Sequence, residues 1–336
     1  MRVTVLLIFI CFALTFKAQN ESGLVNWLTF KEAQEKNKTA PKPFLVDIYT
    51  DWCGWCKHMM KTTYSNPDMA GYINQNFYPV KFDAETKDTV EYNGKKYFPT
   101  SKDPKTPHQL AIKFLGTSLT YPSTFFISNN FEFNLLSQGY MDEKKLEPLL
   151  VFVVENVFRT TQYEDFSERF NRSFYDTVFA KKQIKTYSVQ EAMALMKTKP
   201  KKMLVNIYAD FCNSCKVQTK TTFVDTSLAS YIEKNFYLVN FSAESNDTIL
   251  FKNEKCFKQL VSGYPLNTFA FKVTNGRLVL PSLAILDEKM EMVETLNMYQ
   301  HPKNLKPVLV YFGGNYYKTK KWPEFIADYF KPKKKA

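Results

Sequence analysis

The sequence predicts two tandem α/β domains, each with a mixed central sheet and helices on its faces. Its 336 residues fit two domains of about 100 to 200 residues each. Two CxxC pairs, Cys53/Cys56 and Cys212/Cys215, lie 159 residues apart. Short apolar, β-branched runs alternate with helical patterns around both pairs. A hydrophobic content of 45% and a charged content of 23% exclude a disordered chain or a coiled coil.

The first 18 residues are typical of a secretory signal peptide. Arg2 precedes an apolar run from Val3 to Phe16, and Ala18 marks the expected cleavage site. A spanning helix needs roughly 20 apolar residues, so this run is too short to cross a bilayer. We therefore expect an exported protein without stable membrane insertion, in the periplasm as the first choice and secreted as the second. The expected domains are residues 19–175 and 176–336.

An internal repeat sets the order of the elements. Residues 44–89 and 203–248 align without a gap, with 23 identities in 46 positions. Such a period is best explained by a duplication. In each copy we expect, in order, a buried strand, a helix that begins at the CxxC pair, a helix closing onto a second strand, a proline, two further segments of strand and a last helix. The first copy places these at residues 45–49, 53–64, 72–82, 122–127 and 146–158.

Two segments fall outside this pattern. Residues 90–106 and 249–265 diverge between the copies, and Asn93-Gly94 in the first predicts a surface hairpin, with a plain loop as the alternative. Aromatic residues recur at helical spacing after each copy, which indicates packing of a terminal helix; they are Tyr163, Phe166, Phe170, Trp322, Phe325 and Tyr329.

The two CxxC pairs carry the chemistry. The free N–H groups and the dipole at a helix N-terminus stabilise an anion, so the first cysteine of each pair becomes a thiolate more readily. The second cysteine lies one helical turn on and can close a disulfide with it. We therefore predict that Cys53 and Cys212 are nucleophiles, that Cys56 and Cys215 are resolving cysteines, and that Cys53–Cys56 and Cys212–Cys215 are redox-active disulfides.

Zinc binding and a purely structural disulfide are the alternatives. Paired CxxC zinc sites lie about 15 to 20 residues apart, whereas these pairs lie 159 apart. A disulfide across four residues gains little from loop closure. We therefore expect no metal and no cofactor. Cys256 has no counterpart in the first copy, and its alternatives are a buried thiol, a third partner for the second pair, or an intermolecular link.

The string LVDIYTDWCGWCK from Leu45 to Lys57, with a later proline before an apolar strand, resembles the thioredoxin superfamily. Its nearest likeness is the exported C-terminal domain of bacterial transmembrane thiol:disulfide interchange proteins. The resemblance implies a thioredoxin-like fold for both copies. It implies that Asp47 takes the proton of the resolving cysteine. It also implies a substrate groove formed by Trp52, Tyr121, Pro122 and Pro281.

The second copy departs from the family pattern at the acid. Asn206 stands where the first copy has Asp47, and an amide cannot shuttle a proton. We therefore expect a thiol:disulfide oxidoreductase, of protein-disulfide reductase or isomerase type, whose first domain is the more active. The alternative is an adaptor or chaperone that holds exported proteins with little redox turnover. Expected partners are exported proteins with thiols or disulfides and a separate redox partner.

The excess of basic over acidic residues adds little to the functional prediction. The net charge is +12, and lysines gather near the end of the chain, at Lys318, Lys320, Lys321 and from Lys331 to Lys335. We expect these lysines to form a solvated tail, and the alternative is attraction to anionic envelope surfaces. Since no nucleic-acid motif is present, no nucleic-acid partner is expected.

Overall fold

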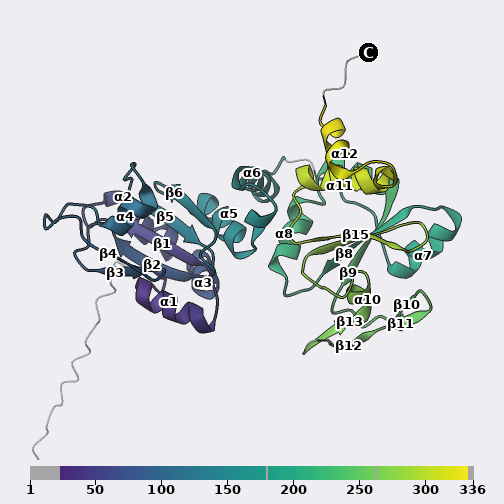
Figure 1. Cartoon of the computed structure of the whole chain (residues 1–336), viewed down its shortest axis with the longest axis horizontal. Helices are drawn as coiled ribbons and strands as arrows, with labels where there is room; N and C mark the ends of the chain where they lie inside the picture. Colours follow the sequence, from purple (N-terminus) through teal and green to yellow (C-terminus); the bar gives the residue numbers. More distant parts are fainter. Residues whose placement is uncertain (1–22, 179–180, 262, 332–336) are drawn as a thin grey trace, which may run out of the picture. The chain divides into compact units, whose positions relative to one another are not determined.

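The computed structural model describes residues 23–178, 181–261 and 263–331 (Figure 1). The chain forms two compact units, which divide between Glu143 and Lys144. The predicted signal peptide, residues 1–18, lies outside the described residues, as do residues 332–336 of the lysine-rich end.

The first unit is built on a four-stranded mixed sheet in the order β2-β1-β5-β6. β1 lies inside this sheet, parallel to β2 and antiparallel to β5, and its first five residues are buried. That burial on both faces explains its continuous apolar sequence. The strands are β1 (Phe44–Tyr49), β2 (Tyr78–Asp83), β5 (Ser123–Ile127) and β6 (Asn134–Gln138).

The helices of the first unit begin at side-chain caps. Thr29 and Glu32 form a capping box at the start of α1, and Asn66 caps α3 one residue before a proline. The helices are α1 (Phe30–Thr39), α2 (Gly54–Lys61), the 3-10 turn η1 (Thr63–Ser65), α3 (Pro67–Asn76) and α4 (Gln109–Leu115). The second unit also has a capping box, which Ser188 and Glu191 form at the start of the helix Val189–Thr198.

The predicted surface hairpin is confirmed. β3 (Val90–Tyr92) pairs with β4 (Lys95–Tyr97) across Asn93 and Gly94, both of which have positive φ. This is the geometry that an Asn-Gly turn favours. The second unit has a hairpin at the same place, β10 (Ile249–Phe251) with β11 (Glu254–Cys256), and adds another, β12 (Lys258–Val261) with β13 (Tyr264–Asn267).

The second unit has a five-stranded mixed sheet in the order β15-β14-β8-β9-β7. The pairings among β8, β9, β14 and β15 match those of the first sheet. The strands are β7 (Thr186–Tyr187), β8 (Lys202–Tyr208), β9 (Phe236–Ser242), β14 (Ser282–Leu286) and β15 (Met292–Asn297). The expected fold class, two tandem α/β units with mixed sheets, is therefore confirmed.

The remaining helices all belong to the second unit, apart from the first residue of α5. They are α5 (Glu143–Val154), η2 (Val157–Arg159), α6 (Tyr163–Phe174), α7 (Val189–Thr198), α8 (Asn213–Thr221), α9 (Thr226–Asn235), α10 (Thr268–Lys272), α11 (Pro302–Gly313), η3 (Tyr316–Lys318) and α12 (Trp322–Tyr329).

The division at Glu143 precedes the boundary expected at residue 175, because α6 packs on the second unit. Phe166 is fully buried, with its ring centroid 5.5 Å from that of Tyr299. Arg169 donates to the carbonyl of Thr221, 2.5 Å away, and lies 3.4 Å from the carboxylate of Asp225. The aromatic residues of α6 are thus packing residues, as expected. They pack, however, on the second copy and not on the first. The corresponding α12 packs its Phe325 on Tyr311 of α11.

Cys256 lies in β11 and is fully buried in the apolar core of the second unit. It forms no disulfide. The structure therefore favours a buried thiol among the three alternatives. Within the described ranges, no helix is long and apolar enough to cross a membrane.

Phe166→Ala should destabilise the second unit by about 3 to 5 kcal/mol, because it empties a fully buried site between α6 and the unit's core. Urea unfolding with hydrogen exchange read at β8 measures this. Val178→Ala is the control, since Val178 is 87% exposed, and should change stability by less than about 0.5 kcal/mol. Equal effects of the two variants would contradict the packing described for α6.

Candidate active site

The first CxxC pair lies between the end of β1 and the first turn of α2. The chain turns after Tyr49, and Cys53 becomes the N-cap of α2. Its Sγ accepts a hydrogen bond from the backbone N–H of Cys56 at 3.1 Å. The two sulfurs are joined in a disulfide, and both residues are at most 5% exposed. A sulfur in the N-cap position receives the N–H groups and the positive end of the dipole, which favours a thiolate after reduction.

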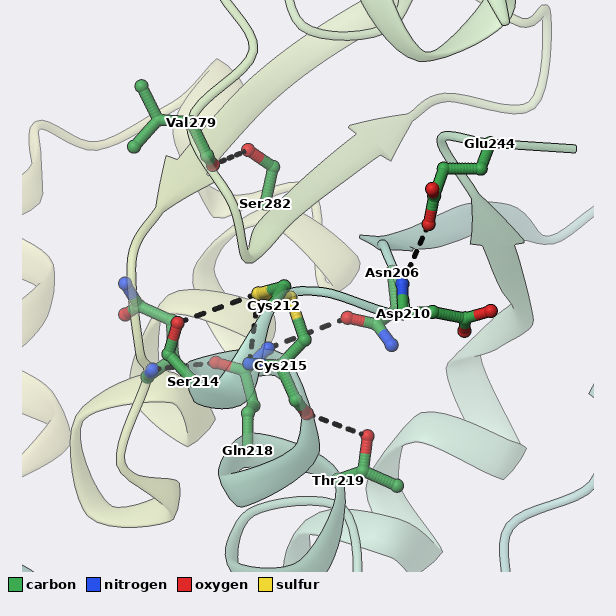
Figure 2. The surroundings of a disulfide bond; sticks show 11 residues. Asn206, Asp210, Cys212, Ser214, Cys215, Gln218, Thr219, Glu244, Val279 and Ser282 are labelled. Carbon is green, nitrogen blue, oxygen red and sulfur yellow. Dashed lines mark hydrogen bonds between the residues drawn. A yellow bond between two sulfur atoms is a disulfide. The ribbon is translucent and has the colours of Figure 1, made fainter. Parts of the chain in front are cut away.

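The second pair repeats this geometry (Figure 2). Cys212 is the N-cap of α8, its Sγ accepts from the backbone N–H of Cys215 at 3.1 Å, and the two cysteines form a disulfide. Both predicted pairings are therefore present. The structure places both predicted nucleophiles at helix N-termini, where the sequence pattern predicts them.

The two predicted prolines follow cis peptide bonds, Tyr121–Pro122 and Leu280–Pro281. Each bond precedes a central strand, β5 or β14. In the second unit Leu280 packs against the cluster of Ala209, Cys212 and Cys215, which sets the proline turn against the disulfide. The turn is closed by Ser282, whose hydroxyl donates to the carbonyl of Val279 (Figure 2). Ser123 donates to Thr120 in the same way in the first unit.

Asp47 lies in β1 and is 1% exposed. Burial raises its pKa to about 7 from an ordinary value of 3.8, although the charge of Lys81 opposes this. Lys81 is its register partner on β2. The Oδ2 atom of Asp47 has no hydrogen-bond partner within the described residues. The first unit therefore contains a carboxyl group that can gain and lose a proton near neutral pH.

A small cavity of about 120 Å³ opens beside Cys56. Tyr49, Lys57 and Lys81 line it, and the Lys81 ammonium lies 4.7 Å from the centre of the Tyr49 ring. Lys81, the register partner of Asp47, therefore lines the same cavity as the resolving cysteine, Cys56. Sequence reasoning missed Lys81, since only the parallel register of β1 and β2 reveals its position opposite Asp47.

The second unit replaces the acid with a chain of amides. Asn206 donates to the side-chain oxygen of Asn240 at 3.0 Å. Gln218 donates to the side-chain oxygen of Asn206 at 3.5 Å and accepts from the backbone N–H of Gln300 at 2.8 Å (Figure 2). In the first copy the corresponding positions hold Asp47, Lys81, Met59 and Met141. These buried amides are thus hydrogen-bonded to one another, and this chain of amides holds no titratable group.

Aromatic side chains surround the first disulfide. Trp52 is 63% exposed, its indole N–H donates to Glu85 at 3.1 Å, and its ring meets Tyr121 edge to face at 6.0 Å. On the other flank, the exposed Trp55 lies 5.6 Å from the Tyr140 ring. Glu85 and Tyr140 were not predicted; both are identical at the matching positions of the second copy, which was the available signal.

The second site is less aromatic. Phe211 stands in place of Trp52 and is 64% exposed, but it has no N–H to donate. Glu244, the counterpart of Glu85, instead accepts from the backbone N–H of Asp210 at 2.8 Å (Figure 2). Tyr299, the counterpart of Tyr140, is fully buried.

Comparisons with known proteins agree with this geometry. Residues 14–153 match the family model Thioredox_DsbH, described as "protein of unknown function, DUF255", and residues 183–271 match the model Thioredoxin_7, described as "thioredoxin-like". An uncharacterized protein of Caenorhabditis elegans, B0495.5, is 30% identical over 74 residues, which are 22% of this chain and 10% of that protein. The chain therefore spans about a tenth of this relative.

Three of the similar solved structures illustrate the range of these matches. A DsbH oxidoreductase is 18% identical, covering 36% of this chain and 79% of its own, with a TM-score of 0.25. A thioredoxin from Thermus thermophilus is 17% identical, covering 40% and 93%, with a TM-score of 0.30. The reduced DsbD C-terminal domain from Neisseria meningitidis is 16% identical, covering 39% and 94%, with a TM-score of 0.25. At these TM-scores the family models and the topology carry the assignment.

Both units are thioredoxin-like domains of the thioredoxin superfamily. Each unit carries a CxxC disulfide at the start of a helix, which is the arrangement that thiol:disulfide exchange requires.

Asp47→Asn should change stability with pH in a defined direction. Burial raises the pKa of Asp47 in the folded chain to about 7. Protonated Asp47 therefore contributes stability below the pKa that it has in the unfolded chain, and this contribution is lost as the pH rises through 7. The variant should therefore gain, relative to the wild type, on the order of 2 to 4 kcal/mol between pH 4 and pH 8. Urea unfolding at both pH values measures the gain. Asp51→Asn, at an exposed site, is the control, and a gain that does not depend on pH would contradict the role of Asp47 burial.

Proposed function

We propose that this chain exchanges disulfides with exported proteins through a mixed disulfide, and that the first unit is the faster catalyst. One observation carries the proposal: Cys53 caps α2 in the unit that also buries an acid with a pKa of about 7, while the second unit has Asn206 at that position. Among the described residues, the first unit alone combines a helix N-cap cysteine with a buried acid whose pKa is about 7.

In the reductive direction the Cys53 thiolate attacks one sulfur of a substrate disulfide. A Cys53–substrate bond forms, the substrate S–S bond breaks, and the first substrate thiolate leaves. Asp47 accepts the proton of Cys56, whose thiolate then attacks Cys53 and releases the second substrate thiolate. The substrate gains two electrons, and the pair becomes the Cys53–Cys56 disulfide. A separate protein dithiol must reduce this disulfide again.

The substrate groove is proposed to lie between the cis-proline turn and the exposed indole of Trp52. Tyr121 and Pro122 precede β5, so an extended substrate segment could pair with the turn while its side chains meet Trp52. The hydrogen bonds to Glu85 hold the indole in place. Pro281 and Phe211 take the equivalent places in the second unit.

Export is part of the proposal. Residues 1–18 have the composition of a signal peptide, and two of the similar structures bear the names DsbH and DsbD. An exported chain meets an oxidising compartment, for which the periplasm is our first choice.

Cys53→Ala should lower the reduction of insulin disulfides by the full chain, with dithiothreitol as the electron source, by at least tenfold, because it removes the nucleophile of the faster unit. Cys212→Ala should lower the rate by less than twofold. Turbidity of the released insulin B chain measures both. Cys256→Ala, at the buried thiol, serves as the control. An unchanged rate in Cys53→Ala would refute the assignment of the first unit.

For the second unit, the alternative proposal is that it serves as an adaptor that holds unfolded exported proteins. The neutral amide chain around Asn206 favours this alternative, since it supplies no proton acceptor. The full chain with Cys53→Ser and Cys56→Ser distinguishes an adaptor from a second catalyst. An adaptor would bind reduced, unfolded protein and leave insulin intact, whereas a second catalyst would retain slow exchange.

A further inference from the structure

The turn before the first CxxC pair holds a buried hydroxyl that makes no hydrogen bond. Thr50 follows the last residue of β1 and is 1% exposed. Its Oγ1 atom has no hydrogen-bond partner within the part of the chain that the structure describes. Buried hydroxyls are almost always hydrogen-bonded, because an unmade bond costs free energy. The Thr50 hydroxyl is therefore a candidate donor to a group that changes during the reaction.

Thr50 lies beside the resolving cysteine. Thr50 and Cys56 line the same cavity of about 120 Å³. The carbonyl of Thr50 accepts a hydrogen bond from the N–H of Cys53 at 3.1 Å, which fixes the backbone of Thr50 next to the pair. Cys56 is 4% exposed, so water stabilises a negative charge on its sulfur poorly. The backbone N–H of Cys56 does not serve this sulfur, because it donates to the sulfur of Cys53.

The matching residue of the second unit shows what a side chain at this position faces. Ala209 stands where the first copy has Thr50, and its carbonyl accepts from the N–H of Cys212 at 3.1 Å, so the two backbones follow the same path. The methyl group of Ala209 packs in one cluster with Cys212 and Cys215. A side chain at this position therefore packs on the CxxC pair. Thr50 brings to the first pair a hydroxyl that Ala209 does not have.

A thiolate on Cys56 supplies the acceptor that the disulfide does not. In the proposed reaction Cys56 becomes an anion once substrate is bound to Cys53 and Asp47 has taken the proton. Neutral sulfur is a weak acceptor, whereas a hydrogen bond to an ionised group is strong, and the hydroxyl of Thr50 is free to rotate toward it. Because a hydrogen bond to the charged form of a group favours that form, such a bond raises the fraction of Cys56 that is ready to attack.

We propose that Thr50 donates a hydrogen bond to the Cys56 thiolate in the mixed disulfide and thereby speeds the resolving step. The inference rests on the proposed disulfide exchange by the first unit. The proton of Cys56 goes to Asp47, and the proton of Thr50 stays on its own oxygen. An electron pair of the Cys56 sulfur forms the new bond to Cys53, while the bond from Cys53 to the substrate breaks and the substrate thiolate leaves. The second unit, with Ala209, has no hydroxyl at this position.

The test uses the full chain with Cys212→Ser and Cys215→Ser as the parent, so that one CxxC pair remains. The pair is reduced with dithiothreitol, the reductant is removed, and glutathione disulfide is added. The Cys53 thiolate attacks one sulfur of glutathione disulfide and releases one glutathione. Cys56 then attacks Cys53 and releases the second glutathione, which closes the Cys53–Cys56 disulfide. Acid quenching and mass spectrometry follow the formation and the decay of the glutathione adduct as separate steps.

Thr50→Val keeps the shape of threonine and removes the hydroxyl. It should lengthen the lifetime of the adduct about three- to tenfold, because less Cys56 is thiolate, and should change the rate of adduct formation by less than about twofold. Thr50→Ser keeps the hydroxyl and should match the parent, whereas Thr50→Ala, which introduces the residue of the second copy, should behave as Thr50→Val does. Thr63→Val is the control: it removes a buried hydroxyl that donates to the carbonyl of Met141 at 2.6 Å, and it should change neither step.

The outcomes separate the two proposals. If neither the adduct nor the Cys53–Cys56 disulfide forms in the parent, the proposed redox function of the first unit fails. If the parent reacts but Thr50→Val and Thr50→Ala leave the lifetime of the adduct unchanged, the role of Thr50 is refuted. It is also refuted if Thr50→Ser lengthens the lifetime as much as Thr50→Val does. Circular dichroism of each variant confirms that it is folded before the comparison is made.

Discussion

The hydrogen bond from a helix N-terminal N–H to a cysteine sulfur is the contact on which both sites depend. In each unit the N–H of the second cysteine donates to the first cysteine's Sγ at 3.1 Å. The central strand, β1 or β8, is buried almost throughout, so its carboxyl end is fixed and the following helix must begin at the cysteine. The apolar strand thus positions the sulfur, and the helix supplies the electrostatics for a thiolate.

What differs between the units lies around this shared contact. The first unit has a buried acid beside a lysine, Asp47 with Lys81, and an open aromatic surface. The second unit has the amide chain of Asn206, and its disulfide is flanked by Ser214. The first unit therefore has a titratable acid that the amide chain of the second unit does not supply.

The sequence predicted the fold and the paired cysteines because both follow from local patterns. Alternating apolar runs, the CxxC spacing and an offset of 159 residues require no tertiary information. Asp47 and the two prolines came from a family resemblance. Lys81 could not be found this way, because its place depends on strand register. The spacing in α6 showed an apolar face, but not which copy would cover it.

The most direct test of two unequal redox centres is a glutathione titration of the wild-type chain, with the redox state of each CxxC pair read by mass spectrometry after alkylation. We expect two separate transitions, one for each CxxC pair, because the surroundings of the two disulfides differ. A single transition shared by both pairs would contradict the inequality of the two centres.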